Sequence, residues 1–319
     1  MPLHAIDNLA TRVKQNIGKV IVGKADVIEL LLIGLITSGH VLLEDVPGTG
    51  KTMLAKSMAR SLSLQFKRIQ FTPDLLPSDL SGIHFYNQKE GDFQFRPGPL
   101  FANILLADEI NRATPRTQSS LLECMEERQV SIDGETMILE QPFMVIATQN
   151  PVEQGGTFPL PEAQLDRFLF KVNMGYPSTA EGLQLLKRFM GTSPLEQLEA
   201  VASKADIEAA QRAYPAVKAT DDLLGYILRI VERTRERDDV AIGASPRASG
   251  ALLRAAQAYA ALRGRDFVTP DDVKAMAKPV LAHRLLLRGM HKGRNRAEEI
   301  IHDILASTEV PTEADIAVR

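Results

Sequence analysis

The stretch DVPGTGKT, residues 45–52, follows the aliphatic run Val41-Leu42-Leu43 and leads into a helical pattern of apolar residues that begins at Thr52. A glycine-rich turn between a strand and a helix lets backbone N–H groups surround phosphate oxygens, and the helix N-terminus adds a favourable dipole. Lys51 supplies a cation for the β- and γ-phosphates, and the Thr52 hydroxyl is a ligand for Mg²⁺. The strict motif has glycine where this chain has Asp45. We predict nucleotide contacts from Pro47, Gly48, Thr49, Gly50, Lys51, Thr52 and Met53.

Two adjacent carboxylates, Asp108 and Glu109, end a second aliphatic run, residues 104–107. On a strand downstream of a phosphate loop, such a pair indicates nucleotide hydrolysis. Asp108 is expected to hold Mg²⁺, directly or through water, and Glu109 to orient and deprotonate the attacking water. A kinase needs no carboxylate after the magnesium ligand, so the pair favours a hydrolysing motor.

Three more polar residues follow in order. Asn150 stands after the aliphatic run 143–148, where an amide can contact the γ-phosphate or the attacking water; alone, Asn150-Pro151 is a turn signal. Arg167, in Leu165-Asp166-Arg167-Phe168, is either a surface arginine or, in a ring, a finger that reaches the γ-phosphate of the neighbouring subunit. Arg247, in Ser245-Pro246-Arg247, begins a helix and can report the γ-phosphate to a second domain.

Strand-length aliphatic runs alternate with helical patterns, which suits a parallel sheet buried on both faces and predicts an α/β doubly wound domain. The runs cover residues 41–43, 67–71, 103–107, 143–148 and 168–174. A more apolar stretch, residues 27–36, is about half as long as a membrane span and contains Glu29, so we interpret it as a buried helix.

The pattern changes at Gly175-Tyr176-Pro177, after which Ser178 and Glu181 form a capping-box signature and helices dominate. We therefore predict an α/β nucleotide-binding domain over residues 1–176 and a helical domain over residues 177–319. Residues 83–96 and 130–139 have the pattern of hairpins. These hairpins are either loop decorations or projections toward a partner.

Composition narrows the functional class. The net charge of −3 gives no electrostatic footprint for nucleic acid. Cys124 is the only cysteine, which excludes an internal disulfide and favours a reducing compartment. The first residues lack the basic start and apolar run of a signal peptide. The scattered histidines do not suggest a protein-bound zinc site. We expect a cytoplasmic protein without a membrane span.

The ordered set of motifs resembles AAA+ ATPases, and longer stretches resemble the MoxR family. These stretches are Ile21-Val22-Gly23, GHVLLE (39–44), DEINR (108–112), ATQNP (147–151) and PLPEAQLDRF (159–168), the last being the most specific. The resemblance extends to about residue 290. It implies a P-loop AAA+ core with a parallel five-stranded sheet flanked by helices, and a C-terminal all-helical lid. It also implies ATP and Mg²⁺ as cofactors, with further nucleotide contacts from Val22, Gly23 and Arg247. Lys24 stands where the family more often has glutamine.

The resemblance also implies a homo-oligomer, usually a hexameric ring, with ATP at the subunit interfaces. Residues 83–96 correspond to the helix-2 insert and residues 130–139 to the hairpin before the sensor strand, both facing the pore or a substrate. The family role is chaperone-like, remodelling or maturing other proteins, including metal-cofactor insertion. A partner with a von Willebrand factor A domain is often implied. The pair His283-Arg284 resembles a feature of the family's lid, and we expect it to serve packing or an interface rather than catalysis.

Alternative functions remain open at this point. A DNA- or RNA-linked motor of the same AAA+ branch is disfavoured by the acidic net charge. The motor subunit of a metal chelatase, which inserts magnesium or cobalt into a tetrapyrrole, would use the same ring and ATP site. A degenerate ring member without hydrolysis is disfavoured because Lys51, Asp108, Glu109 and Arg167 are intact. The sequence does not name the client protein.

Overall fold

The structure is a computed structural model that describes residues 3–44, 48–150, 156–190, 194–289 and 295–311. Within these residues the main sheet has the strand order β2-β5-β8-β1-β9, with all neighbours parallel. Its strands are β1 (Val41–Glu44), β2 (Phe66–Gln70), β5 (Ile104–Asp108), β8 (Met144–Gln149) and β9 (Phe170–Val172). The predicted parallel sheet is confirmed, with strand ends shifted by a few residues.

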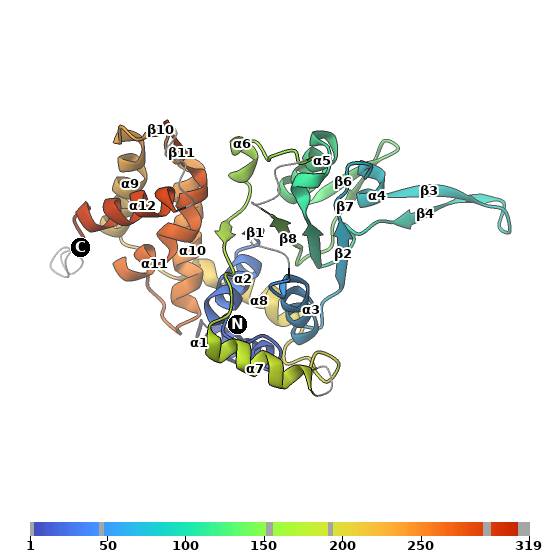
Figure 1. The fold of residues 1–319 in the computed structure, drawn as a ribbon, viewed down its shortest axis with the longest axis horizontal. Coiled ribbons are helices and arrows are strands. Elements are labelled where there is room, and N and C mark those ends of the chain that lie inside the picture. The colour runs from blue at the N-terminus through green and yellow to red at the C-terminus, as the bar shows by residue number, and fades with distance from the viewer. Residues whose placement is uncertain (1–2, 45–47, 151–155, 191–193, 290–294, 312–319) are drawn as a thin grey trace.

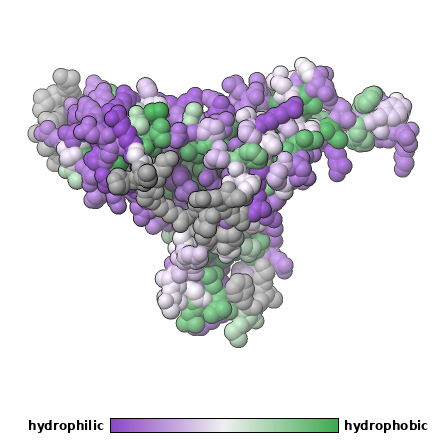
Figure 2. All heavy atoms as spheres, turned by 45° about the horizontal axis from the view of Figure 1, so that its top comes forward, coloured by the Kyte–Doolittle hydropathy of each residue, from purple (hydrophilic) through white to green (hydrophobic). Residues whose placement is uncertain are grey.

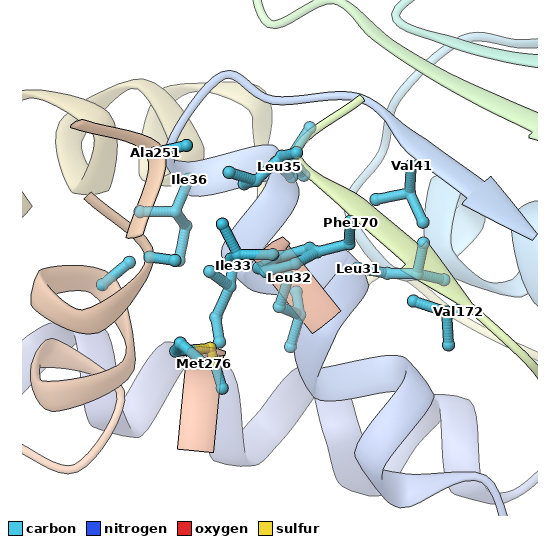
Figure 3. Packing of buried hydrophobic residues seen from close by; sticks show 14 of the residues in the cluster. Leu31, Leu32, Ile33, Leu35, Ile36, Val41, Phe170, Val172, Ala251 and Met276 are labelled. Carbon is cyan, nitrogen blue, oxygen red and sulfur yellow. The ribbon is translucent and has the colours of Figure 1, made fainter. Parts of the chain in front are cut away.

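Both faces of the sheet are buried, as the aliphatic runs predict. Val41 and Leu43 belong to one hydrophobic cluster, while Leu42 belongs to the other, since successive residues of a strand face opposite sides. One face is covered by helices α1 (Leu3–Gly18), α2 (Ala25–Ile36) and α3 (Lys51–Ser61), and the other by α5 (Pro115–Glu127). Helix α2 is the buried helix predicted for residues 27–36. In Figure 3 its side chains lie against Val41 and Phe170 of the sheet and against Ala251 and Met276 of later helices.

Two antiparallel hairpins leave the main sheet. The first is β3 (Gly82–Asn87) with β4 (Asp92–Pro97), preceded by α4 (Pro77–Ser81), and it forms the long arm in Figure 1. The second is β6 (Gln129–Ile132) with β7 (Glu135–Ile138). A 2.7 Å contact between His84 Nδ1 and Asp133 Oδ2 joins the two hairpins. Phe85, Tyr86 and Phe93 are exposed on the arm, which carries apolar and polar patches in Figure 2.

The C-terminal half is mainly helical, and the helices within residues 221–307 lie beside the sheet domain in Figure 1. Helix α6 (Glu162–Leu165) precedes β9, and the helices after β9 are α7 (Thr179–Phe189), α8 (Lys204–Ala213), α9 (Asp221–Glu236), α10 (Pro246–Ala261), α11 (Pro270–Leu281) and α12 (Arg296–Ser307). Two 3-10 segments lie in this half, η2 (Tyr214–Ala216) and η3 (Ala282–Arg284), and η1 (Ile110–Arg112) follows β5 in the sheet domain. The predicted capping box is present, because Ser178 Oγ accepts from the Glu181 N–H at 3.3 Å and the Ser178 N–H donates to Glu181 Oε2 at 2.6 Å.

One feature of this half is not predicted by the helical patterns. Strands β10 (Val240–Ile242) and β11 (Leu286–Leu287) pair antiparallel and connect the end of α9 with the residues after η3. The pair is too short to show a period of two in the sequence. Among the described helices, none combines the length and apolar character needed to cross a bilayer.

Candidate active site

The phosphate loop follows β1, and α3 begins directly after it at Lys51. Gly48 and Gly50 have φ angles of 86° and 90°, in the left-handed region that favours glycine. Gly50 is the N-cap of α3, so the backbone N–H groups of the first helical turn lie at the loop. Thr52 and Met53 lie in that turn. Pro47, with Asp45, falls outside the described residues.

The two carboxylates lie at the carboxyl end of β5, on the same edge of the sheet as the phosphate loop. Thr148 at the end of β8 connects them: its hydroxyl donates to Asp108 Oδ1 at 2.6 Å and accepts from the Glu109 N–H at 2.8 Å. Glu109 has a φ of 56°, an uncommon conformation for a residue with a side chain. Backbone strain of this kind is concentrated at functional sites.

Strand β2 supplies partners that the motif analysis does not identify. Arg68 contacts Asp108 Oδ2 through Nη2 at 2.6 Å and Nε at 3.1 Å. Gln70 donates to Glu109 Oε2 at 2.5 Å, and Arg112 Nε lies 3.1 Å from the same oxygen. The sequence feature that indicates these partners is the i, i+2 spacing of Arg68 and Gln70, which places both on one face of a strand beside β5.

Asn150 lies directly after β8, and its residue is only 6% exposed. Strand β8 separates β5 from β1 in the sheet. The structure therefore places Asn150 between the carboxylate pair and the phosphate loop.

Val22 and Gly23 lie in the loop between α1 and α2. The neighbouring Lys24 Nζ donates to the carbonyls of Met174 at 2.5 Å and Gly175 at 3.2 Å, which ties this loop to the segment after β9. A Cβ on Gly23 would lie 1.6 Å from Glu181 Oε1, so the α7 N-terminus packs directly on this glycine. A cavity of about 710 Å³ opens here between the sheet domain and helices α11 and α12.

Arg167 and Arg247 lie away from the phosphate loop of their own chain. Arg167 precedes β9, and the Leu169 N–H donates to the His40 carbonyl at the start of β1. Because β1 and β9 are parallel, this is the edge opposite the phosphate loop, about 13 Å away along a four-residue strand. Both arginines contact one carboxylate: Arg167 Nε lies 3.3 Å from Glu126 Oε2, and Arg247 Nη2 lies 2.6 Å from Glu126 Oε1. The structure does not bring them to the loop of their own chain.

His283 and Arg284 attach the helical half to the segment that carries Arg167. Arg284 has a side chain only 3% exposed; its Nε donates to Asp166 Oδ1 at 2.6 Å and its Nη2 to the Phe168 carbonyl at 2.8 Å. Burial lowers the Arg284 pKa, and the Asp166 charge opposes this. Burial also lowers the His283 pKa well below its ordinary value, so its ring is neutral while Nε2 donates to the Phe168 carbonyl at 3.1 Å. This arrangement is packing, as expected.

A divalent metal bound by protein side chains alone is not indicated in the described part of the chain, where no cluster of three or more His, Cys, Asp or Glu residues occurs. Thr52 and Asp108 nevertheless match the donors that Mg²⁺ uses beside nucleotide phosphates, since both are oxygen ligands at one edge of the sheet. The left-handed glycines and the N-terminus of α3 suit the phosphates themselves.

Known proteins match this chain over most of its length. A family model described as ATPase family associated with various cellular activities (AAA) matches residues 40–170, and an AAA lid domain model matches residues 232–304. The uncharacterized protein YeaC of Bacillus subtilis is 52% identical over 96% of this chain and 95% of its own length. Chaperone MoxR1 of Mycobacterium tuberculosis is 45% identical over 89% of this chain and 76% of its own length. The crystal structure of a protein from Cytophaga hutchinsonii that is described as a putative ATPase superposes with a TM-score of 0.90 at 41% identity, over 97% of this chain and 96% of its own.

Proposed function

The chain belongs to the MoxR family of AAA+ ATPases, and we propose from this premise how its own residues hydrolyse ATP and what the energy serves. ATP binding and hydrolysis follow from the family. The assignment of each residue to a role is our proposal, and the observation that supports it best is the meeting of loop, carboxylate pair and Asn150 at one edge of the sheet.

The phosphates of ATP bind the loop through the N–H groups around Gly48 to Met53 and through the Lys51 ammonium. Val22 and Gly23 lie on the adenine side, beside the cavity under α11 and α12. Mg²⁺, when bound by Thr52 and Asp108, supplies positive charge against the β- and γ-phosphates. Glu109 accepts a proton from the attacking water, and Asn150 orients that water or the γ-phosphate.

Gln70 and Arg112 hold the Glu109 carboxylate through one oxygen, Oε2. This leaves Oε1 as the atom that takes the proton from water. The left-handed backbone conformation of Glu109 and the hydrogen bond from its N–H to Thr148 fix the backbone position from which the side chain projects. The site is thereby preorganised, which is the main way a protein accelerates phosphoryl transfer.

Arg167 acts on the ATP of a neighbouring subunit. Its position at the opposite edge of the sheet supports this role, because a side chain there faces away from its own phosphate loop. Arg247 lies beside it, so we assign it the same direction, in trans. In a ring, usually of six subunits, each phosphate loop receives the two arginines of the next subunit. An arginine finger is worth roughly 10³–10⁵ in rate.

The work done by hydrolysis is chaperone-like remodelling or maturation of other proteins in the cytoplasm, metal-cofactor insertion included. The name of MoxR1 as a chaperone supports this proposal. The β3–β4 arm, with exposed Phe85 and Phe93, and the β6–β7 hairpin beside it suit contact with a client or the pore. A protein with a von Willebrand factor A domain is the proposed partner. The chelatase motor and the nucleic-acid motor are less well supported, because YeaC and MoxR1, at 52% and 45% identity, match over 95% and 76% of their own length, and neither is named as a chelatase or a nucleic-acid motor.

The test is an ATPase assay with Mg²⁺ across protein concentration, on wild type and Glu109→Gln. We expect specific activity to rise with concentration in the wild type, because the sites form between subunits. Glu109→Gln should bind a fluorescent ATP analogue normally and hydrolyse ATP about 10²–10⁴-fold more slowly. Hydrolysis at the wild-type rate by Glu109→Gln would refute the assignment of the base, and activity independent of concentration down to the monomer would refute the shared sites.

A further inference from the structure

Among the residues that the structure describes, Glu126 is the carboxylate that joins the two arginines assigned to the neighbouring site. It lies in the last turn of α5, and its two oxygens are divided between Arg167, at 3.3 Å, and Arg247, at 2.6 Å. The two arginines come from different parts of the chain: Arg167 from the loop before β9 and Arg247 from the first turn of α10. One side chain of the sheet domain therefore determines how far apart they lie.

The end of α5 is well anchored. His40 Nε2 donates to the Met125 carbonyl at 2.9 Å, and the Val145 N–H donates to His40 Nδ1 at 2.9 Å. His40 is only 4% exposed. The residue before Glu126 is thus tied to the starts of β1 and β8, so Glu126 has a fixed position relative to the main sheet.

The arginines need such a partner because their surroundings are strongly basic. The hollow of about 340 Å³ around them is lined, among described residues, by the arginines 128, 167, 247, 254 and 284 and by the carboxylates Glu126 and Asp166. Asp166 is already engaged by the buried Arg284. Without Glu126, Arg167 and Arg247 would repel each other and separate into solvent.

We propose that Glu126 is a positioning residue that holds Arg167 and Arg247 side by side, so that both reach the γ-phosphate of the neighbouring subunit together. This inference rests on the proposed trans role of the two arginines. Each guanidinium presents five N–H donors, so each keeps donors for phosphate while bonded to Glu126.

The same contact gives the helical half a direct influence on the neighbouring site. Arg247 belongs to α10, and Ser245 before it donates to Asp166 Oδ2 at 3.3 Å. A displacement of α10 that breaks the Arg247–Glu126 ion pair would also move Arg247 away from Arg167. ATP hydrolysis in the neighbouring subunit therefore requires that the helical half of this subunit packs on its sheet domain.

The experiment compares Glu126→Gln with Glu127→Gln in the full chain. Gln keeps the side-chain size and removes the charge. Glu127 is exposed in the same helix, and the ion pairs of the described residues do not include it, so it is the matched control. Because the Glu126 side chain is about one-third exposed (34%), the variant should fold, and thermal unfolding checks this.

We expect kcat of Glu126→Gln to fall about ten- to a hundredfold, the usual penalty for misplaced catalytic groups, with the affinity for a fluorescent ATP analogue unchanged. Glu127→Gln should match the wild type. Added Lys51→Ala subunits, which have a dead site but intact arginines, should restore turnover to Glu126→Gln. In an Arg167→Ala, Arg247→Ala background, Glu126→Gln should have no further effect.

Three results would overturn the inference. An unchanged or raised kcat in Glu126→Gln would show that the arginines need no such partner. A loss that Lys51→Ala subunits do not restore would place the effect of Glu126 within its own subunit. If Arg167→Ala itself keeps the wild-type kcat, the proposed trans role fails and Glu126 has nothing to position, which separates that failure from the first two.

Discussion

Acidification should destabilise the protein through His40. Burial lowers the pKa of His40 to about 3 from an ordinary value of 6.5, the Arg128 charge adds to this, and the hydrogen bond to the Met125 carbonyl opposes it. The ring is neutral when folded, with Nε2 donating to Met125 and Nδ1 accepting from the Val145 N–H. In the unfolded chain the same ring takes up a proton below pH 6.5.

Because of this difference in proton binding, the unfolding free energy decreases as the pH falls. Between pH 6.5 and 3 the unfolded state binds more protons, so stability is fully present above pH 6.5 and is lost as the pH falls toward the folded pKa. One pH unit is worth about 1.36 kcal/mol for a single group. From pH 7 to pH 5, His40 alone should therefore remove about 2 kcal/mol of unfolding free energy.

Urea denaturation at pH 7 and pH 5 measures this loss in the wild type and in His40→Gln. Glutamine offers a donor and an acceptor but does not titrate. The variant should be less stable at pH 7, yet its loss between the two pH values should be smaller than that of the wild type by about 2 kcal/mol. The buried His283 also has a lowered pKa, but it contributes equally to both chains. Equal losses in both chains would refute the neutral, hydrogen-bonded His40.

Other contacts give further expectations. Arg284→Ala should lower the unfolding free energy by about 3–5 kcal/mol in urea, because it removes the buried guanidinium that pairs with Asp166 and bonds nearby carbonyls; a loss below 1 kcal/mol, on the order of a surface pair, would contradict this. Thr148→Val should cost about 1–3 kcal/mol and slow ATP hydrolysis, since it removes both bonds to the carboxylate pair, and the idea fails if kcat is unaltered. Gly50→Ala, at φ 90°, should add about 1–2 kcal/mol of backbone strain and weaken binding of a fluorescent ADP, which unchanged affinity would disprove.

The sheet and the motif positions could be predicted from the sequence because they depend on local patterns. Strands buried on both faces read as continuous aliphatic runs, and Gly48 to Thr52 and the pair Asp108–Glu109 are contiguous. The family resemblance was also local, carried by stretches such as residues 159–168.

The contacts between distant segments could not be predicted. Gln70 reaches Glu109 only because β2 pairs with β5 in a particular register. The separation between Glu126 and Arg247 is 121 residues, and Arg284 is 118 residues from Asp166. Nothing in the local pattern distinguishes the buried Arg284 from an exposed arginine, because its burial depends on how the helical half packs on the sheet domain.

The most direct test of shared active sites mixes two variants that are each inactive. Arg167→Ala keeps its own phosphate loop and lacks the finger, whereas Lys51→Ala lacks a working loop and keeps the finger. If the arginine serves the neighbouring subunit, the mixture should hydrolyse ATP although neither variant does so alone, with a maximum near equal amounts. A mixture that forms joint oligomers but stays inactive, or an Arg167→Ala chain that hydrolyses ATP at the wild-type rate by itself, would contradict the assignment.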